Sequence, residues 1–523
     1  MAFHLLDAVI IAAYLIVVAV IGVIVTRRTH SSEDLFLAGR SLGFFAIGLS
    51  LFASNISSTT LIGLMGSAYQ SGIAVAHYEL MAGIILVLMC VLTIPVFLRA
   101  HLTTIPEYLG RRFGPAARSY VSALTIFLSV FVDTAGSVYA GVLVMQTFWP
   151  DLPFLPTCVA FATFAGLYTA AGGLRAVVYT DVVQAIVLII GAGVMSWEVF
   201  ARFDFDWQHA VAAISPEHLS LIRPADDPGL PWPGVLIGLP VLGFYYWATN
   251  QYIMQRVLGA RSLDEARWGS MLAAALKILP LFLLVIPGAF AAALLPGLDN
   301  PDQLFPTLVM HFLPTGLTGL VLAGLIAAIM STIDSTLNAA STLVMHDFVR
   351  PGERGWPEQR TLRYGRLTTA AFIVVASLWP LAIREFPGLF SYIQQVFSYA
   401  VPPVVAIFLL GMLWRGMTGR AAVLVLATGH GAGALLLAWQ FWCRQQGVDS
   451  GLPHFTILAG LTTLACCVLG IAISRLAPAP RPAGPDLLWQ ASDWRTAQRG
   501  WRDYRLQGGL VLGIITLLVW LLR

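Results

Sequence analysis

The sequence predicts an all-α protein that crosses a membrane many times. Of its 523 residues, 58% are hydrophobic and only 11% are charged, whereas soluble globular proteins carry about 25% charged residues. Apolar stretches of about 20 residues, the length that spans ~30 Å of hydrocarbon as a helix, recur along the chain. The arginines gather in alternate joins between these stretches. We therefore expect a multi-pass protein of the inner (plasma) membrane, embedded in the lipid bilayer.

Fourteen stretches are apolar and long enough to form membrane spans. They cover residues 5–26, 42–68, 73–98, 119–148, 154–173, 177–199, 234–255, 269–295, 315–345, 367–383, 388–413, 421–441, 455–474 and 506–522. No join is long enough for a soluble domain, and the chain has no G-x-x-x-x-G-K-[ST] loop for a nucleotide. We therefore expect one membrane domain, residues 1–523, with no nucleotide, nucleic-acid or organic cofactor partner.

The positive charges indicate how this domain is oriented. The chain has 29 arginines and one lysine, Lys277. With the N-terminus placed outside, 24 arginines fall in inside joins and five in outside segments (Arg202, Arg223, Arg384, Arg444 and Arg523). This bias follows the positive-inside rule, and an even number of spans then places both termini outside.

Two of the predicted spans contain sequences that interrupt a helix. Span 42–68 carries a polar run from Ser54 to Thr60, and span 234–255 carries Gly238, Pro240 and Gly243. The two spans are five apart, so they enter the membrane from opposite faces. Interrupted helices at matching positions of inverted repeats mark the binding site of many transporters. The alternative is that glycine and proline are simply common in membrane helices.

Five ionisable side chains fall well inside spans: Glu79, Asp133, Asp181, Lys277 and Asp334. A charge at the centre of a membrane helix costs ~2.5–3.5 kcal/mol on insertion scales. Such residues either face a cavity and a partner, or form buried ion pairs or protonated acids that stabilise helix packing. The surroundings of Asp133 in the sequence favour neither interpretation.

Span 315–345 contains a cluster of side-chain oxygens. Ser331, Thr332, Asp334 and Ser335 place four such groups on about one helical turn. Hard cations prefer oxygen ligands, so this turn indicates a cation site. The alternative is that these hydroxyls bond the carbonyls of the preceding turn or hold helices together.

Many spaced motifs resemble those of the sodium/solute symporter family, and within it the sodium/glucose and sodium/galactose cotransporters. The similar stretches are Leu37–Arg40, Ala53–Gly66, Tyr78–Glu79, Thr104–Tyr108, Gly172–Gly173, Tyr179–Val182, Leu230–Gly234, Tyr246–Trp247, Gln255–Arg256, Lys277, Ser331–Ser335, Tyr392–Gln394 and Pro402–Pro403. The resemblance implies a leucine-transporter-like fold with two inverted five-helix repeats, at 42–199 and 234–413. Helices at 5–26 and 421–522 would be peripheral.

The resemblance also implies site residues. The sodium ligands would be the carbonyls of Ala53, Ile56 and Ala328 and the hydroxyls of Ser331 and Thr332. Asp181, Asp334 and Ser335 are candidates for a second cation site. The solute would contact Glu79, Lys277 and Gln394, with Tyr246 stacked on it as the inner gate and Trp247 beside it. Asn55 would bond this gate, and Leu64, Tyr78 and Phe390 would form an apolar outer gate.

Three pocket positions differ from the bacterial galactose carrier. Thr60 stands where that protein has a glutamine, Ala82 where it has a serine, and Gly243 where it has an asparagine. Each change removes or shortens a hydrogen-bonding group, so we expect a roomier and less polar pocket.

These observations favour a secondary symporter that couples inward sodium flow to uptake of a sugar or polyol by alternating access. The alternative within transport is a sodium-coupled symporter of an organic acid or amino acid, with Lys277 serving a carboxylate. A polytopic membrane enzyme would need a metal or nucleophile cluster, and the ten histidines do not form one. A passive channel would not need two gates and two broken helices.

Overall fold

The computed structural model describes residues 4–26, 37–349, 358–384, 386, 388–477 and 484–523. Within these ranges, the structure describes the backbone but not the side chains of residues 22, 23, 26, 164–173, 358, 359, 361, 362 and 366. Five of the arginines counted as inside therefore lie outside the described residues: Arg27, Arg28, Arg350, Arg354 and Arg481.

The described chain is helical, as the composition predicts, and contains no named strand. Nine of its helices are long and apolar enough to cross a membrane, or up to eleven if each of two bent pairs is one span. Two shorter apolar helices, Leu5–Ile21 and Phe154–Thr163, coincide with further predicted spans. The number fourteen and the side on which the termini lie stay predictions.

The first half of the chain builds one bent span and several long ones. Its helices are α1 (Leu5–Thr26), α3 (Phe44–Asn55), the π-helix η2 (Thr59–Leu64), α4 (Met65–Ser71), η3 (Ile73–Ala76), α5 (His77–Val91), α6 (Thr93–Arg99), α7 (Ile105–Phe113), α8 (Pro115–Phe127), the π-helix η4 (Leu128–Thr134), α9 (Ala135–Phe148) and α10 (Phe154–Ala201). Short η1 (Ala38–Arg40) precedes α3. Span 42–68 bends by 57° between α3 and η2–α4, as its polar run predicts.

Helix α10 joins two predicted spans, 154–173 and 177–199, without a break in the helical backbone. It has 48 residues, and a straight helix of that length would measure about 72 Å. That is more than twice the ~30 Å of a hydrocarbon core. Within α10, the segment Leu174–Ala201 is long and apolar enough to cross a membrane, and Phe154–Thr163 is a shorter apolar segment.

The second half begins with the other interrupted span. Its elements are α11 (Trp207–Ala212), η5 (Pro216–Leu219), α12 (Trp232–Ile237), α13 (Leu239–Phe244), the π-helix η6 (Tyr245–Thr249), α14 (Gln251–Leu258), α15 (Leu263–Leu276), the π-helix η7 (Leu281–Val285), α16 (Ile286–Leu294), η8 (Pro301–Gln303), α17 (Leu304–Phe312) and α18 (Leu317–Leu343). They are followed by the π-helix η9 (Val344–Val349), α19 (Glu358–Leu378), α20 (Pro380–Ile383), α21 (Leu389–Ala400), α22 (Pro402–Leu413), α23 (Gly419–Gln446), α24 (Phe455–Leu476), η10 (Pro485–Leu487), η11 (Ala491–Trp494), η12 (Gly500–Arg502) and α25 (Tyr504–Leu521).

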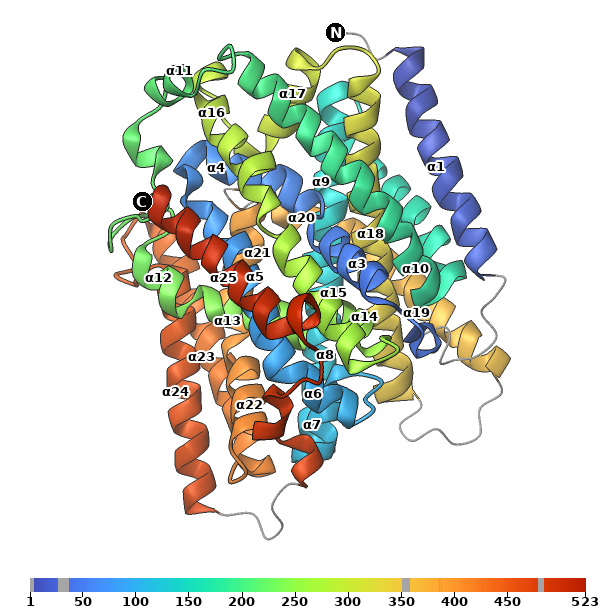
Figure 1. Cartoon of the computed structure of the whole chain (residues 1–523), viewed down its shortest axis with the longest axis vertical. Helices are drawn as coiled ribbons and strands as arrows, with labels where there is room; N and C mark the ends of the chain where they lie inside the picture. Colours follow the sequence, from blue (N-terminus) through green and yellow to red (C-terminus); the bar gives the residue numbers. More distant parts are fainter. Residues whose placement is uncertain (1–3, 27–36, 350–357, 385, 387, 478–483) are drawn as a thin grey trace.

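The interior of the bundle is organised around α18. In the most apolar 18-residue stretch of the span that contains α18, 78% of the stretch is buried inside the protein. The corresponding share for α25 is 22%, so most of that helix faces outward. Helix α18 packs on α10, α1, α3, α9 and α19. In Figure 1, α1 lies at one edge and α24 at the other, with α5, α13 and α21 between them. The polar side chains Ser50 and Ser54 on α3 and Ser331 and Thr332 on α18 are buried within the bundle.

Candidate functional site

A cavity of about 90 Å³ lies between the two interrupted spans, with room for several water molecules. Its walls come from α3, η2, α5, η4, α13, η6, α14, α18 and α21. Seven of the eight predicted solute residues line it: Thr60, Glu79, Ala82, Gly243, Tyr246, Trp247 and Gln394. The structure thus brings together residues that lie more than 300 positions apart in the sequence.

Three of the lining segments are π-helical. Thr59 and Thr60 come from η2, Asp133 from η4, and Tyr246 from η6. A π-helical turn is rare and often occurs at functional sites, because it shifts a side chain out of the regular helical register. The backbone of all three helices is therefore adapted at the level of the cavity.

The eighth predicted solute residue, Lys277, stands behind the cavity wall. Its ammonium group is fully buried and forms an ion pair with the carboxylate of Glu79. The rings of Trp247 and Phe52 lie 5.5 and 5.9 Å from the ammonium nitrogen. Lys277 therefore neutralises and orients Glu79, which presents its carboxylate on the cavity side.

The predicted gates lie at two parts of the cavity wall. Tyr78 and Phe390 meet edge to face, with ring centroids 4.9 Å apart. At the inner gate the hydroxyl of Tyr252 donates to the hydroxyl of Tyr246 at 2.6 Å. Asn55 also lines the cavity. Leu64 is fully buried in η2 and is not among the lining residues.

The break after α3 frees backbone carbonyls. In a continuous helix the amide of Ser57 would bond the carbonyl of Ala53, but here it bonds Asn55 at 2.8 Å. In the same way the amide of Thr60 bonds Ser57 at 3.0 Å rather than Ile56. The carbonyls of Ala53 and Ile56, predicted from the resemblance as sodium ligands, have therefore lost their helical donors.

The predicted ligands on α18 are buried and already in contact with acceptors. The hydroxyl of Thr332 donates to the carbonyl of Ala328 at 3.0 Å, and the hydroxyl of Ser331 donates to Asp181 at 2.5 Å. A hydroxyl that donates its proton still offers its lone pairs to a cation. Helix α18 packs on α3, so these oxygens lie on the side of the bundle where the break occurs.

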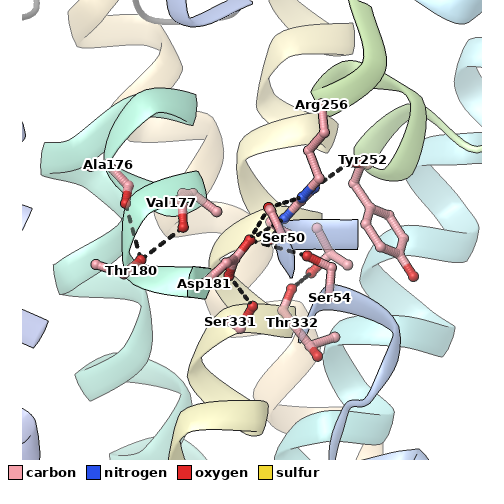
Figure 2. A network of polar contacts seen from close by, with 12 residues as sticks. Ser50, Ser54, Ala176, Val177, Thr180, Asp181, Tyr252, Arg256, Ser331 and Thr332 are labelled. Atoms are coloured by element: carbon pink, nitrogen blue, oxygen red, sulfur yellow. Dashed lines mark hydrogen bonds and ion pairs between the residues drawn. The ribbon is translucent and has the colours of Figure 1, made fainter. Parts of the chain in front are cut away.

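A buried polar network ties four helices together beside these oxygens (Figure 2). Asp181 of α10 accepts from Ser50 at 2.5 Å and Ser54 at 3.2 Å on α3. The guanidinium of Arg256 on α14 donates to Asp181 at 3.0 Å. Because Asp181 is fully buried, this ion pair and its hydroxyl partners hold the geometry of the region.

The same network bears on the candidate second cation site. Ser335 accepts from Arg256 at 2.7 Å, so the guanidinium lies between Ser335 and Asp181. Asp334 is also buried, with 2% of its surface exposed. In this structure a protein cation, Arg256, therefore holds the position between two of the three candidate residues.

Some site residues could not be assigned from the sequence. The sequence patterns do not indicate Ser50, Tyr252 or the role of Arg256, and they favour neither interpretation of Asp133. Ser50 lies four residues before Ser54, so the two share one face of α3. That spacing was a signal for Ser50, but the partners on α10 and α14 come from remote parts of the chain.

The profile of the sodium:solute symporter family matches residues 35–429 of the chain. The chain belongs to this family. It is therefore a sodium-coupled symporter embedded in the membrane, and its relatives are cotransporters rather than enzymes.

Curated relatives of this symporter include proteins named for inositol and for glucose. The mouse sodium/myo-inositol cotransporter 2 is 34% identical over 85% of the chain and 71% of its own length. Human sodium/glucose cotransporter 4 is 33% identical over 93% of the chain and 78% of its own length. The sodium/glucose cotransporter of Vibrio parahaemolyticus is 34% identical over 80% of the chain and 82% of its own length.

Solved structures share the fold of this symporter. A sodium-coupled sialic acid symporter in a substrate-bound, outward-open state superposes with a TM-score of 0.76 at 21% identity, covering 92% of this chain and 99% of its own. A nucleobase-cation-symport-1 family transporter in a closed conformation superposes with a TM-score of 0.54 at 16% identity, covering 86% of this chain and 96% of its own. These are leucine-transporter-fold proteins, as the resemblance implies.

Proposed function

We propose that this symporter couples inward sodium flow to uptake of a polyhydroxylated solute, a sugar or a polyol. The observation that carries the proposal is the composition of the cavity wall. Glu79, Gln394 and Thr60 offer acceptors and donors, while Tyr246 and Trp247 offer aromatic surface. A sugar or cyclitol presents hydroxyl groups at its edge and C–H groups on its faces, so it matches such a wall. The printed names of the inositol and glucose cotransporters support the same class.

We place the sodium ion at the carbonyls of Ala53, Ile56 and Ala328 and the hydroxyls of Ser331 and Thr332. Support comes from the loss of helical donors at the first two carbonyls and from the buried hydroxyls on α18. Thr332 also lines the solute cavity, so the two binding sites are adjacent. Sodium bound there would join α3 to α18, which explains how ion binding can favour one arrangement of the solute cavity.

An organic acid or amino acid is the second candidate. Lys277 was the residue that could have served a carboxylate, but its ammonium is paired with Glu79 and lies outside the described cavity lining. A free anion would then meet the carboxylate of Glu79 rather than a positive group. The arrangement therefore favours a neutral solute over an anionic one.

The test is a counterflow panel in proteoliposomes, with glucose, galactose, myo-inositol, a linear polyol, lactate and alanine as external solutes, in sodium or in potassium. We expect exchange with a sugar or polyol in sodium and none in potassium. Exchange with lactate or alanine alone would contradict the proposed solute class. Equal exchange in both salts would contradict sodium coupling.

A further inference from the structure

One carboxylate in the cavity has no role in the function described so far. Asp133 lies on the π-helix η4 and lines the same cavity as Glu79 and Tyr246. Only 7% of its surface is exposed. Its Oδ2 atom is buried and has no hydrogen-bond partner among the described residues. A buried carboxylate oxygen without a partner is costly, so such a group commonly has a ligand in another state of the protein.

The neighbours of Asp133 on η4 fix its direction. The hydroxyl of Thr134 is within hydrogen-bonding distance, 2.7 Å, of the hydroxyl of Thr336 on α18, and the carbonyl of Phe131 accepts from Tyr392 on α21 at 2.9 Å. The π-helical turn is thus held on two sides by other helices. Asp133 is left facing the cavity between them, so it is well placed to meet a bound solute.

The charges of the cavity do not cancel. Glu79 is neutralised by Lys277, and no lysine or arginine is among the described residues that line the cavity. Asp133 is the second carboxylate among these described lining residues, and no cation among them compensates its charge. A donor group on the solute can supply the missing partner, and a positively charged donor does so more strongly than a hydroxyl.

We infer that Asp133 is a solute-binding and specificity-determining residue, which accepts a hydrogen bond from the solute and makes the cavity prefer ammonium-bearing over carboxylate-bearing members of the sugar class. The inference rests on the proposed function and deepens it. Hydroxyl groups of a neutral sugar satisfy the Asp133 carboxylate. A protonated amino group on the same ring satisfies it better, and a ring carboxylate is repelled.

The experiment compares three competitors with one ring: glucose, glucosamine and glucuronate. Each competes with the radiolabelled solute that gives the strongest signal in the counterflow panel, in wild type, in Asp133→Asn and in Asp299→Asn. Asp299 lies in an exposed loop, so it is a matched carboxylate-to-amide control. We expect wild type and the control to bind glucosamine most tightly and glucuronate most weakly. In Asp133→Asn the ratio of glucosamine to glucuronate affinity should fall by about 10- to 100-fold, because a hydrogen bond to a charged group is lost.

Three results would overturn the inference. An unchanged glucosamine-to-glucuronate ratio in Asp133→Asn shows that the carboxylate does not meet the solute. A change in the sodium concentration for half-maximal uptake, with that ratio unchanged, assigns Asp133 to the ion instead. If none of the three competitors acts on wild type although the panel shows exchange of a sugar or polyol, the inference is overturned and the proposed function stands; a panel without such exchange overturns the proposed function. Should Asp133→Asn fail to fold, Asp133→Glu, which keeps the charge, must keep the preference for glucosamine.

Discussion

Lys277 and Glu79 illustrate how one buried contact combines stability with recognition. A lysine ammonium that is fully buried in a membrane protein needs a counter-charge, and Glu79 supplies it. The same ion pair fixes the carboxylate that faces the solute cavity. Removing either partner leaves the other as an uncompensated buried charge, which costs far more than the pair contributes.

We therefore expect Lys277→Met and Glu79→Gln each to lower the unfolding temperature, because breaking a buried pair costs about 3–5 kcal/mol. The double variant should be more stable than either single variant, since no unpaired charge remains, yet it should still take up solute poorly. Thermal unfolding in detergent and uptake in proteoliposomes measure the two effects. Single variants as stable as wild type would contradict the ion pair.

The hydroxyls of α18 give a second prediction. Thr332→Ala or Ser331→Ala should raise the sodium concentration for half-maximal uptake about 10- to 100-fold, as expected when a cation loses one ligand. Thr342 is the matched control, since it is buried on the same helix and donates to the carbonyl of Asn338 at 2.7 Å. An increase as large in Thr342→Ala would show that the effect comes from the helix and not from the ligands.

Among the elements, η8 is the segment that packs over the outer gate. It contacts η2, α4 and α9, and a Cβ added at Gly66 of α4 would stand 2.5 Å from the carbonyl oxygen of Pro301. Asp302 of η8 accepts from the amide of Leu389 at 2.8 Å, at the N-terminus of α21. The next residue along α21 is the gate residue Phe390. Docking of η8 is thus coupled to the position of the gate helix.

The contact between Asp302 of η8 and the start of α21 predicts that the docking of η8 depends on pH. Burial raises the pKa of Asp302 from 3.8 to about 6, and the bond from the Leu389 amide lowers it only in part. A raised carboxyl pKa means that the docked state binds the proton more tightly than the undocked state. Docking therefore gains stability as the pH falls from about 6 to about 4, by at most roughly 3 kcal/mol, and it loses that stability above pH 6.

The prediction can be measured with a cysteine placed at Ser57 in the cavity and labelled by an impermeant maleimide. In wild type, labelling at pH 5 should be slower than at pH 7.5, after normalisation to a cysteine at the exposed position Asp299. In Asp302→Asn the normalised rate should not change with pH, because the titrating group is gone. If the normalised labelling rate of Asp302→Asn changes with pH as much as that of wild type, a group other than Asp302 causes the pH dependence.

For the molecule as a whole, the number of cations that accompany each solute sets how far the solute can be accumulated. One charge moved through ~100 mV supplies ~2.3 kcal/mol, and a tenfold gradient requires ~1.4 kcal/mol. One sodium ion thus supports about 50-fold accumulation from voltage alone, and two support a few thousand-fold. The candidate second site includes Asp181 and Ser335, both of which bond Arg256 here, and also Asp334.

We expect one charge per solute in wild type and in Asp334→Asn, because Arg256 already holds the position between Asp181 and Ser335. The ratio of charge to solute moved under a clamped potential is the measurement. A ratio of two that falls to one in Asp334→Asn would contradict this expectation and establish a second cation at the carboxylate. A ratio of two in both proteins would place the second cation elsewhere.

The sequence alone determined the class of the molecule and most of its cavity. Apolar length and charge depletion dictate membrane helices, because an unpaired backbone or an isolated charge is too costly in hydrocarbon. The polar run after Ala53 predicted the bend, and seven of the eight solute positions taken from the family resemblance line the cavity. The bend is a local feature, since it depends on the order of residues within one span, whereas the solute positions depend on the resemblance to the family.

Only the tertiary structure decided how charges on different spans are paired. Lys277 could have faced the solute, but the packing of α15 on α5 places it against Glu79. Asp181 could have held a cation, but α14 brings Arg256 to it. Asp133 had no assigned surroundings until η4 was seen between α18 and α21. A single sequence records which charges each helix carries, whereas their partners depend on helix packing, which brings together residues from distant parts of the chain.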